Sequence, residues 1–320
     1  MSIKSILRNA LDSILLVRGL QLVKVNEYKN LISFNGSVFE ERSKIAKQKD
    51  TIDSIVFSKD RAMQLHAFLV SFIEMTTDAG KVYILYKATS DRHKKSYNDL
   101  ISHFKDEEFV FIEENNFKRQ LIEIYEDSNS KTIGLYVDDM IFLNPIDYNA
   151  ISNINYLNYI VSLSRGENFV FSQVLNKKLI PPEFVKLNNG FTCFNWNSSN
   201  EYSDWTYPLG VSGYFYDRVE FLVMIRSIDF IAPNSLEGNL QIYLPLFQFR
   251  FGLCMESISC VAVSANIVQS EWTNPILGSF SVEMLLLNWE KGLCIDTTKF
   301  YFKDGQLAQY QDYEFIPRSW

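Results

Sequence analysis

Two adjacent carboxylates, Asp138 and Asp139, directly follow a run of apolar and β-branched residues at 132–137. Such a run is typical of a buried strand, and more apolar residues follow at 140–142. Because unpaired carboxylates beside a core strand cost several kcal/mol, a cation is expected next to them. Carboxylate oxygens are the ligands that Mg²⁺ and Mn²⁺ prefer, so the pair is a candidate metal site. The alternative is a strand that ends in a turn with two solvated aspartates.

A second group of polar residues follows the strand-like run 51–57. It consists of Ser58, Lys59, Asp60 and Arg61. Apolar residues recur at helical spacing from Met63 onward, which predicts a helix there with Asp60 as its N-cap. The polar group is therefore predicted to be a strand-to-helix turn, where backbone amides and basic side chains bind anions.

Strand-like runs and helical patterns alternate further along the chain. The strand-like runs lie at 81–86 and 108–112, and the helical patterns at 91–104 and 116–125. This alternation favours an α/β fold with a mostly parallel central sheet flanked by helices. Ligands of such sheets bind at the carboxyl ends of the strands. The 58–61 turn, Lys87 and the aspartate pair all fall at such ends. The sequence therefore predicts one ligand-binding edge, formed by the carboxyl ends of the strands.

The order of these motifs resembles that of nucleotide-sugar glycosyltransferases of the GT-A fold, of the bacterial surface-polysaccharide type. Those enzymes carry an Asp-x-Asp motif at the corresponding strand end, where this chain has Val137, Asp138 and Asp139. The resemblance implies a Rossmann-like sheet and a metal, Mn²⁺ or Mg²⁺, that Asp139 and Asp138 hold on the diphosphate of a nucleotide sugar. A UDP-sugar is the expected donor. The residues expected to contact the donor are Ser58, Lys59, Asp60, Arg61, Lys87, Lys118 and Asp138.

The resemblance extends into the C-terminal half, at 204–215, 233–237 and 266–269. The family tends to carry an Asp and a His in the region that matches the first segment, where this chain has Ser212 and Tyr214. A histidine there would be a natural third metal ligand, and this chain lacks it. In this half, strands are predicted at 159–163 and 191–196 and a helix at 215–228.

Glu237 is the candidate catalytic base. Inverting sugar transfer needs a carboxylate that takes the proton of the acceptor hydroxyl, and the resemblance implies such a group near the start of a helix after the acceptor loop. A structural role is the alternative: with Asn234 as N-cap, Glu237 falls at N3, where its carboxylate reaches the cap amide. Asp204 and Asp217 are the fallback bases.

Composition limits the classes of function. The chain has 320 residues, enough to bury a sizeable core, and its net charge of −7 argues against nucleic-acid binding. The four cysteines have no C-x-x-C spacing, and the three histidines have no metal-ligand spacing. Reduced core cysteines are therefore expected, which points to the cytoplasm.

Residues 1–24 interleave apolar residues with lysine and arginine, a pattern typical of a basic amphipathic helix. Such a helix either lies on the inner face of the cytoplasmic membrane as a peripheral contact or packs against protein. The apolar run 14–17 is too short to span a bilayer, and no signal-peptide cleavage pattern follows it.

Two domains are expected: an N-terminal helix and linker at 1–50, and a GT-A-like domain at 51–320 with a nucleotide-sugar-binding half (51–145) and an acceptor half (146–320). The predicted function is metal-dependent transfer of a sugar to a glycan or lipid-linked glycan acceptor in bacterial surface polysaccharide biosynthesis, such as O-antigen or capsule. Two alternatives stay open: a nucleotidyltransferase that makes an activated sugar, and a non-catalytic glycan-binding protein on the same fold. The first usually has a glycine-rich loop after its first strand, and 58–61 contains no glycine.

Overall fold

The computed structural model describes residues 25–45, 48–105, 107–187, 190–197, 202–247, 249–263, 265–266, 268 and 280–320. The chain divides into two compact units, 1–44 and 45–320. Helix α2 (Val25–Ser43) is the described element of the first unit, and the predicted amphipathic helix at 1–24 lies outside the described residues. No helix within the described ranges is long and apolar enough to cross a membrane.

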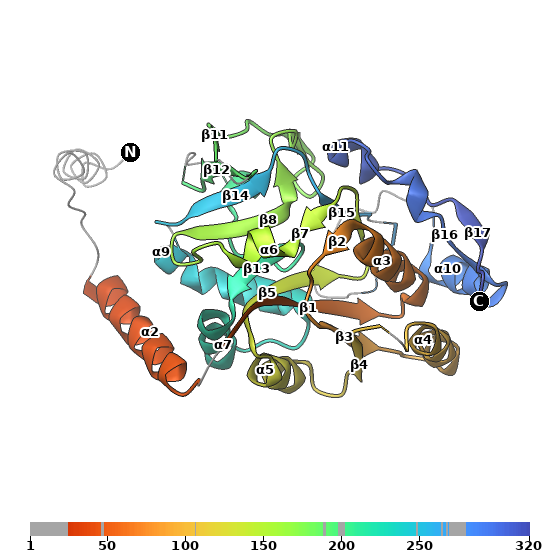
Figure 1. The fold of residues 1–320 in the computed structure, drawn as a ribbon, viewed down its shortest axis with the longest axis horizontal. Helices are drawn as coiled ribbons and strands as arrows, with labels where there is room; N and C mark the ends of the chain where they lie inside the picture. The colour runs from red at the N-terminus through yellow and green to blue at the C-terminus, as the bar shows by residue number, and fades with distance from the viewer. Residues whose placement is uncertain are drawn as a thin grey trace. The chain divides into compact units, whose positions relative to one another are not determined.

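The second unit is built on a nine-stranded sheet in the order β11-β12-β14-β8-β13-β5-β1-β3-β4 (Figure 1). The strands are β1 (Lys49–Lys59), β3 (Val82–Lys87), β4 (Phe109–Glu113), β5 (Ser130–Val137), β8 (Tyr159–Gly166), β11 (Val185–Lys186), β12 (Thr192–Asn195), β13 (Tyr214–Asp217) and β14 (Phe251–Met255). Strands β4, β3, β1 and β5 are parallel, whereas β13 is antiparallel to both of its neighbours, β5 and β8. Because β5 and β8 thus run in the same direction, their carboxyl ends share one edge of the sheet.

The predicted α/β class with a mostly parallel sheet is confirmed. Strands β1, β3, β4 and β5 lie where the apolar runs predicted them. The helix predicted at 215–228 is wrong at its start, because residues 214–217 form β13 and α7 (Arg218–Ser227) begins only after it. Tyr214 and Phe215 pair with both β5 and β8, and this two-sided pairing outweighs the local helical pattern.

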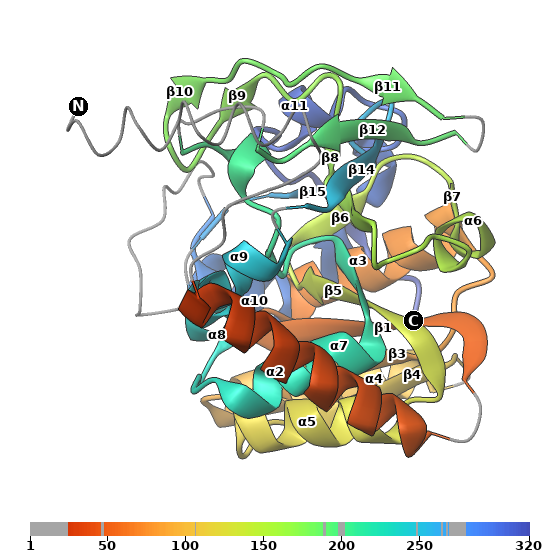
Figure 2. The ribbon, with the colours of Figure 1, turned by 90° about the vertical axis from the view of Figure 1, so that its left-hand side faces the viewer.

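Helices cover both faces of the sheet (Figure 2). The helices next to the parallel strands are α3 (Ala62–Met75), α4 (Asp91–His103) and α5 (Phe117–Asp127). Val56 is in register with Tyr136, whose ring centroid lies 5.4 Å from that of Phe68 on α3. The next residue of β1, Phe57, faces the other way and packs on Phe117 of α5 at 5.2 Å. Helices α3 and α5 therefore cover opposite faces.

The starts of α4 and α5 follow from their capping residues. The Ser90 hydroxyl accepts a hydrogen bond from the His93 amide (3.3 Å), and the Asn116 side chain accepts one from the Arg119 amide (3.0 Å). Serine and asparagine are favoured at this position because they satisfy a backbone donor that the helix leaves unpaired. Both helices begin within one residue of their predicted starts.

The C-terminal segment packs over α3 at an aromatic cluster around His66. The ring centroid of His66 lies 5.7 Å from that of Trp289 on α10 (Val282–Glu290) and 5.9 Å from those of His103 and Trp320. Burial lowers the pKa of His66 to about 3, and the neighbouring charges of His103 and Arg318 act in the same direction. His66 is therefore neutral in the folded protein at ordinary pH.

Lowering the pH should weaken the fold through His66. The unfolded chain binds a proton at its ordinary histidine pKa of about 6.5, whereas the folded chain does so only near pH 3. Stability is therefore lost as the pH falls through this window, by about 2 kcal/mol between about pH 7 and pH 5. Urea unfolding at the two pH values should show that His66→Phe removes this part of the pH dependence. An unchanged dependence in the variant would contradict the assignment.

Candidate active site

The first polar cluster of the site lies where β1 and β5 end. Phe57 is in register with Val137, so the turn after β1 and the aspartates after β5 lie side by side. Asp138 is buried, and its Oδ2 accepts hydrogen bonds from the Ser58 hydroxyl (2.9 Å) and the Lys59 amide (3.1 Å). These bonds fix the end of β5 to the turn after β1.

Arg61 supplies the cation that was expected beside the carboxylates. Its Nη1 donates to Asp138 Oδ1 (3.0 Å) and to Asp139 Oδ2 (2.9 Å). Its Nε donates to Asn266 Oδ1 (2.8 Å), and its Nη2 donates to the Asn266 carbonyl. Because the guanidinium is buried, water screens these charge-assisted hydrogen bonds little. They join three segments that are distant in sequence.

The charges of this cluster shift one another's pKa. Burial raises the pKa of Asp138 to about 6, against the lowering effect of Arg61. Burial also disfavours the charged form of Arg61, but the carboxylates of Asp138 and Asp139 outweigh it and raise the pKa of Arg61 above its ordinary value. The guanidinium therefore stays cationic and compensates the charge of the aspartates.

The turn after β1 differs from its prediction at Asp60. The sequence predicts Asp60 as the N-cap of α3, but Arg61 occupies that position without a side-chain cap bond. Asp60 has a φ of 55°, in the left-handed region, and its carboxylate accepts hydrogen bonds from the amide and the hydroxyl of Thr89 (2.7 Å each). The prediction is wrong because this backbone conformation directs the carboxylate to the loop after β3.

The two aspartates differ in what they offer a metal. Among the described residues there is no group of three His, Cys, Asp or Glu side chains that could hold an ion. Both oxygens of Asp138 accept hydrogen bonds within the cluster, whereas Asp139 uses one oxygen for Arg61 and its side chain is 13% exposed. The site fits an ion held by the second oxygen of Asp139 and by the ligand's own oxygens, rather than one chelated by both aspartates.

Two of the three lysines that the sequence suggests for donor binding, Lys87 and Lys118, have acidic partners. Lys87 ends β3 in register with Lys59, at the predicted binding edge, and its ammonium group pairs with Glu114 (2.8 Å). Lys118, on α5, pairs with Asp229 (2.9 Å). Neither lysine has a hydrogen bond to the aspartates after β5 among the contacts of the described residues.

Asp217, one of the fallback bases, lies at the other end of the strands, where β5 begins. It pairs with Thr132, near the start of β5, which places it about 20 Å along the strand from Asp138. Its carboxylate accepts a hydrogen bond from the Glu220 amide (2.9 Å) and caps α7. The structure therefore argues against Asp217 as a base for chemistry beside Asp138.

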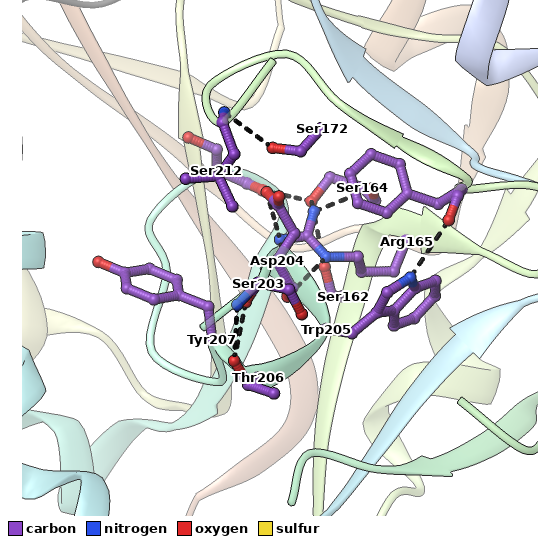
Figure 3. A network of polar contacts seen from close by, with 12 residues as sticks. Ser162, Ser164, Arg165, Ser172, Ser203, Asp204, Trp205, Thr206, Tyr207 and Ser212 are labelled. Carbon is purple, nitrogen blue, oxygen red and sulfur yellow. Dashed lines mark hydrogen bonds and ion pairs between the residues drawn. The ribbon is translucent and has the colours of Figure 1, made fainter. Parts of the chain in front are cut away.

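A second polar cluster gathers at the end of β8 and in the segment before β13 (Figure 3). Arg165 is buried near the carboxyl end of β8. Its Nη2 lies 3.6 Å from Asp204 Oδ1, and its Nε and Nη2 donate to the Asp204 carbonyl at 3.4 Å each. Asp204 begins a short helix, η1 (Asp204–Thr206). Since β5 and β8 are parallel, this cluster shares the sheet edge of Asp138.

Glu237 joins the second cluster from helix α8 (Pro233–Leu240). Its Oε2 accepts a hydrogen bond from the Val211 amide (2.9 Å). Burial raises the pKa of Glu237, although the Val211 amide, the nearby Tyr207 side chain and the charge of Arg165 lower it. A carboxylate with a raised pKa is a stronger base at neutral pH than an ordinary one.

The predicted capping role of Glu237 is wrong. The N-cap of α8 is Ala232, with Pro233 at the first helical position and Ser235 at N3. The Ser235 hydroxyl accepts the hydrogen bond of the Ala232 amide (3.1 Å). The helix begins two residues earlier than Asn234 predicts because proline is favoured at the first helical position. The Glu237 carboxylate therefore has no part in the cap.

The segment before β13 runs between the ends of β5 and β8. The Gly213 amide donates to the Leu135 carbonyl (2.8 Å), and the Gly213 carbonyl accepts from the Leu163 amide (2.8 Å). Gly213 has a φ of 76°, which favours glycine. This turn holds Val211, the hydrogen-bond partner of Glu237, at the binding edge.

Ser212 and Tyr214 lie in the region where the family that this chain resembles tends to carry an Asp and a His. Both residues have structural contacts here. The Ser212 carbonyl accepts a hydrogen bond from the Ser164 hydroxyl (3.0 Å). The Tyr214 hydroxyl donates to the Tyr207 carbonyl (3.1 Å). These contacts hold the loop in place and offer no metal ligand.

Two residues of the site were not predicted from the sequence. The Tyr97 hydroxyl lies 2.6 Å from the Ser58 hydroxyl and accepts a hydrogen bond from the Arg61 amide (3.2 Å). A lone aromatic residue in a polar helix gives no signal for such a role. The sequence does contain a signal for Arg165. It is a cation just after the apolar run 159–163, and so at the end of a predicted strand, where ligands of such sheets bind.

No family model matches the chain. A curated relative, the bifunctional glycosyltransferase pgtA of Dictyostelium discoideum, is 26% identical over 261 residues that cover 72% of this chain and 34% of the relative. This chain therefore spans about a third of the length of the relative that it matches. The relative confirms the predicted resemblance to glycosyltransferases.

Solved structures show partial likenesses in shape. TarS of S. aureus has a TM-score of 0.40 and 8% identity, covering 67% of this chain and 61% of that chain. The mannosyltransferase PcManGT of Pyrobaculum calidifontis, in complex with GDP-Man and Mn²⁺, has a TM-score of 0.29 and 13% identity, covering 43% and 47%. A nucleotidyl transferase of Methanothermobacter thermautotroptrophicus has a TM-score of 0.38 and 10% identity, covering 65% and 88%.

Removing the buried cation should destabilise the fold strongly. Arg61→Gln leaves Asp138 and Asp139 without their charge partner, and breaking a buried pair in this way costs about 3 kcal/mol or more. Arg92 is the matched control, because it also contacts two carboxylates, Glu283 and Glu290, but on the surface. Arg92→Gln should leave the urea midpoint almost unchanged. Equal losses in the two variants would show that Arg61 has no special structural role.

Proposed function

We propose that this chain is a glycosyltransferase that moves a sugar from a nucleotide-sugar donor to a glycan acceptor. The observation that carries the proposal is the arrangement of two polar clusters along one edge of the sheet. One cluster contains Asp139, partly exposed at the end of β5, and the other contains Glu237, held by the Val211 amide. The similarity to a curated glycosyltransferase supports the same class of reaction.

The proposed donor site is the edge formed by the turn after β1 and the end of β5. The ammonium group of Lys59 suits the negative charge of a diphosphate. The amides of Lys59, Asp60 and Arg61 already donate to Asp138, to the Lys87 carbonyl and to Tyr97. Asp139 would hold Mn²⁺ or Mg²⁺ there, and Asp138 would position Ser58 and Arg61. The metal, when bound, offsets the charge of the leaving diphosphate. A UDP-sugar is the donor that we propose.

The proposed base is Glu237. The Val211 amide fixes one carboxylate oxygen, which leaves the other to receive the proton of an acceptor hydroxyl. Burial raises the pKa of this carboxylate, so that it binds a proton more readily as the acceptor oxygen attacks the anomeric carbon. Asp204 pairs with Arg165 and serves in this scheme as a neighbour of the base.

The acceptor that we propose is a glycan, or a lipid-linked glycan, of a bacterial surface polysaccharide. The basic pattern of residues 1–24 supports a peripheral contact with the inner face of the cytoplasmic membrane, which would bring the domain to a lipid-linked acceptor. These residues lie outside the described part of the chain, so this step rests on the sequence alone.

Loss of the Asp139 charge should abolish metal-dependent donor binding. A nucleotide sugar present at about 100 times its Kd stabilises the fold by about 2.7 kcal/mol. Thermal unfolding with a panel of nucleotide sugars, with and without Mn²⁺, should show this gain for the wild type and not for Asp139→Asn. Asp138→Asn should instead lower the melting temperature without ligand, because Asp138 is a partner of Arg61. Mn²⁺-dependent binding by Asp139→Asn equal to that of the wild type would refute the metal assignment.

Replacement of the proposed base should slow transfer without loss of fold. In Glu237→Gln the amide oxygen can still accept the Val211 hydrogen bond, but the side chain cannot take a proton. Release of nucleoside diphosphate should fall by about 10²-fold or more while donor binding is kept. Asp217→Asn is the matched control, since asparagine is an equally good N-cap for α7, and its turnover should be normal. Near-normal turnover in Glu237→Gln would remove Glu237 from the mechanism.

A further inference from the structure

A short hairpin, residues 170–180, follows β8 beyond the carboxyl end of that strand (Figure 2). It contains two antiparallel strands, β9 (Phe171–Ser172) and β10 (Lys177–Lys178). The side-chain oxygen of Gln306, on the short helix α11, accepts hydrogen bonds from the first two amides of the hairpin (2.8 and 2.9 Å). The hairpin is therefore held to the domain by strand pairing and by side-chain contacts.

The hairpin lies beside the second polar cluster. The Lys177 ammonium group donates a hydrogen bond to the Tyr202 carbonyl (3.2 Å). Just before the hairpin, the Phe169 carbonyl accepts a hydrogen bond from the Trp205 indole (3.2 Å), and the two rings are 5.7 Å apart. Asp204 lies between Tyr202 and Trp205 in the chain. A partner bound to the hairpin would therefore lie next to the segment that carries Asp204.

The outer face of the hairpin exposes aliphatic side chains. Ser172 is buried and so lies on the inner face, whereas Lys178 pairs with the neighbour of Ser172 and lies on the outer face. Ile180, two residues after Lys178, is 92% exposed, and Val174, at the tip of the hairpin, is 66% exposed. Single exposed aliphatic residues are ordinary on a protein surface, so the charges and the backbone around these two decide what they indicate.

The charge around the exposed aliphatic residues is positive. Residues 170–187 contain three lysines and one glutamate, in a chain whose net charge is −7. Lys186 pairs with Glu256 (2.8 Å), whereas Lys177 and Lys178 have no acidic partner among the described residues. Lysines interleaved with exposed aliphatic side chains favour a membrane that carries anionic lipids, because the headgroups attract the lysines and the acyl boundary takes up the aliphatic groups.

The backbone after β10 also suits a membrane better than a protein partner. Ile180 is followed by Pro181 and Pro182, neither of which has an amide hydrogen. Amide donors left without a partner are costly where water is excluded by lipid, and the prolines remove two of them beside the most exposed side chain. They also remove donors with which an added strand of a partner protein would pair.

We propose that the hairpin 170–180 is a membrane-contact surface, whose lysines bind anionic lipid headgroups while Val174 and Ile180 enter the acyl boundary. Its role in catalysis rests on the proposed function, because a membrane at the hairpin would bring a lipid-linked acceptor to the second cluster. The contact is separate from the one proposed for residues 1–24, since it is formed by residues of the folded domain.

Binding of the full chain to lipid vesicles tests the proposal. The vesicles contain phosphatidylglycerol and phosphatidylcholine in equal parts, or phosphatidylcholine alone, and binding is measured by co-sedimentation. Ile180→Asp should weaken binding to the anionic vesicles about tenfold. Ile231→Asp is the matched control, because Ile231 is 77% exposed on the segment before α8 and should bind as the wild type does.

A second pair of variants tests the charge. Lys178→Glu should weaken binding to the anionic vesicles about tenfold and change binding to phosphatidylcholine vesicles little. Lys95→Glu makes the same change of net charge at an exposed lysine of α4 and should have a much smaller effect. Equal losses in Lys178→Glu and Lys95→Glu, or in Ile180→Asp and Ile231→Asp, would overturn the proposal.

Hydrogen exchange of the wild type locates the contact without any substitution. The amides of residues 170–187 should exchange more slowly when anionic vesicles are present. Protection confined to residues 1–24, or no binding to vesicles, would overturn the proposal. So would a dimer that Ile180→Asp dissociates while vesicle binding is unchanged, because a second copy would then cover the hairpin. The vesicles contain no glycan and no nucleotide, so a failure of the proposed transferase activity would be seen separately, as a protein that binds vesicles but no nucleotide sugar.

Discussion

The fold depends on the neutralisation of two carboxylates at the end of β5, an interior strand of its sheet. Asp138 is buried, and Asp139 lies beside it, so both need a positive charge close by. Arg61 provides it and at the same time binds Asn266, which is more than 200 residues away in the chain. These hydrogen bonds hold the ends of β1 and β5 and the segment at Asn266 in fixed positions relative to one another. This arrangement forms the proposed donor site.

In the second cluster a different buried arginine compensates the charge of a carboxylate. Arg165 at the end of β8 pairs with Asp204, and the antiparallel strand β13 between β5 and β8 places both clusters at one edge. In each cluster a buried guanidinium pairs with one carboxylate that remains partly exposed, Asp139 in the first cluster and Asp204 in the second. The arrangement suits the sugar transfer that we propose, because one side of that reaction must bear diphosphate charge and the other must accept a proton.

The sequence predicted well those features that depend on local pattern. The apolar runs located β1, β3, β4 and β5, and the alternation with helices predicted the mostly parallel sheet. Predictions that depend on distant partners were less successful. Asp60 bonds to Thr89 in another loop instead of capping α3, and β13 gains its pairing from two strands that lie far away in the chain. The carboxylates required a cation, but no local signal distinguished Arg61 from a bound metal.

The central claim is that one ligand site extends from Asp139 to Glu237 along the sheet edge. A crystal structure of the protein with Mn²⁺ and the nucleotide sugar that stabilises it most tests this directly. The diphosphate should lie at the turn after β1 beside Asp139, and the anomeric carbon should face the Glu237 carboxylate. A nucleotide bound at another place, or a sugar directed away from Glu237 with the diphosphate in position, would contradict the claim.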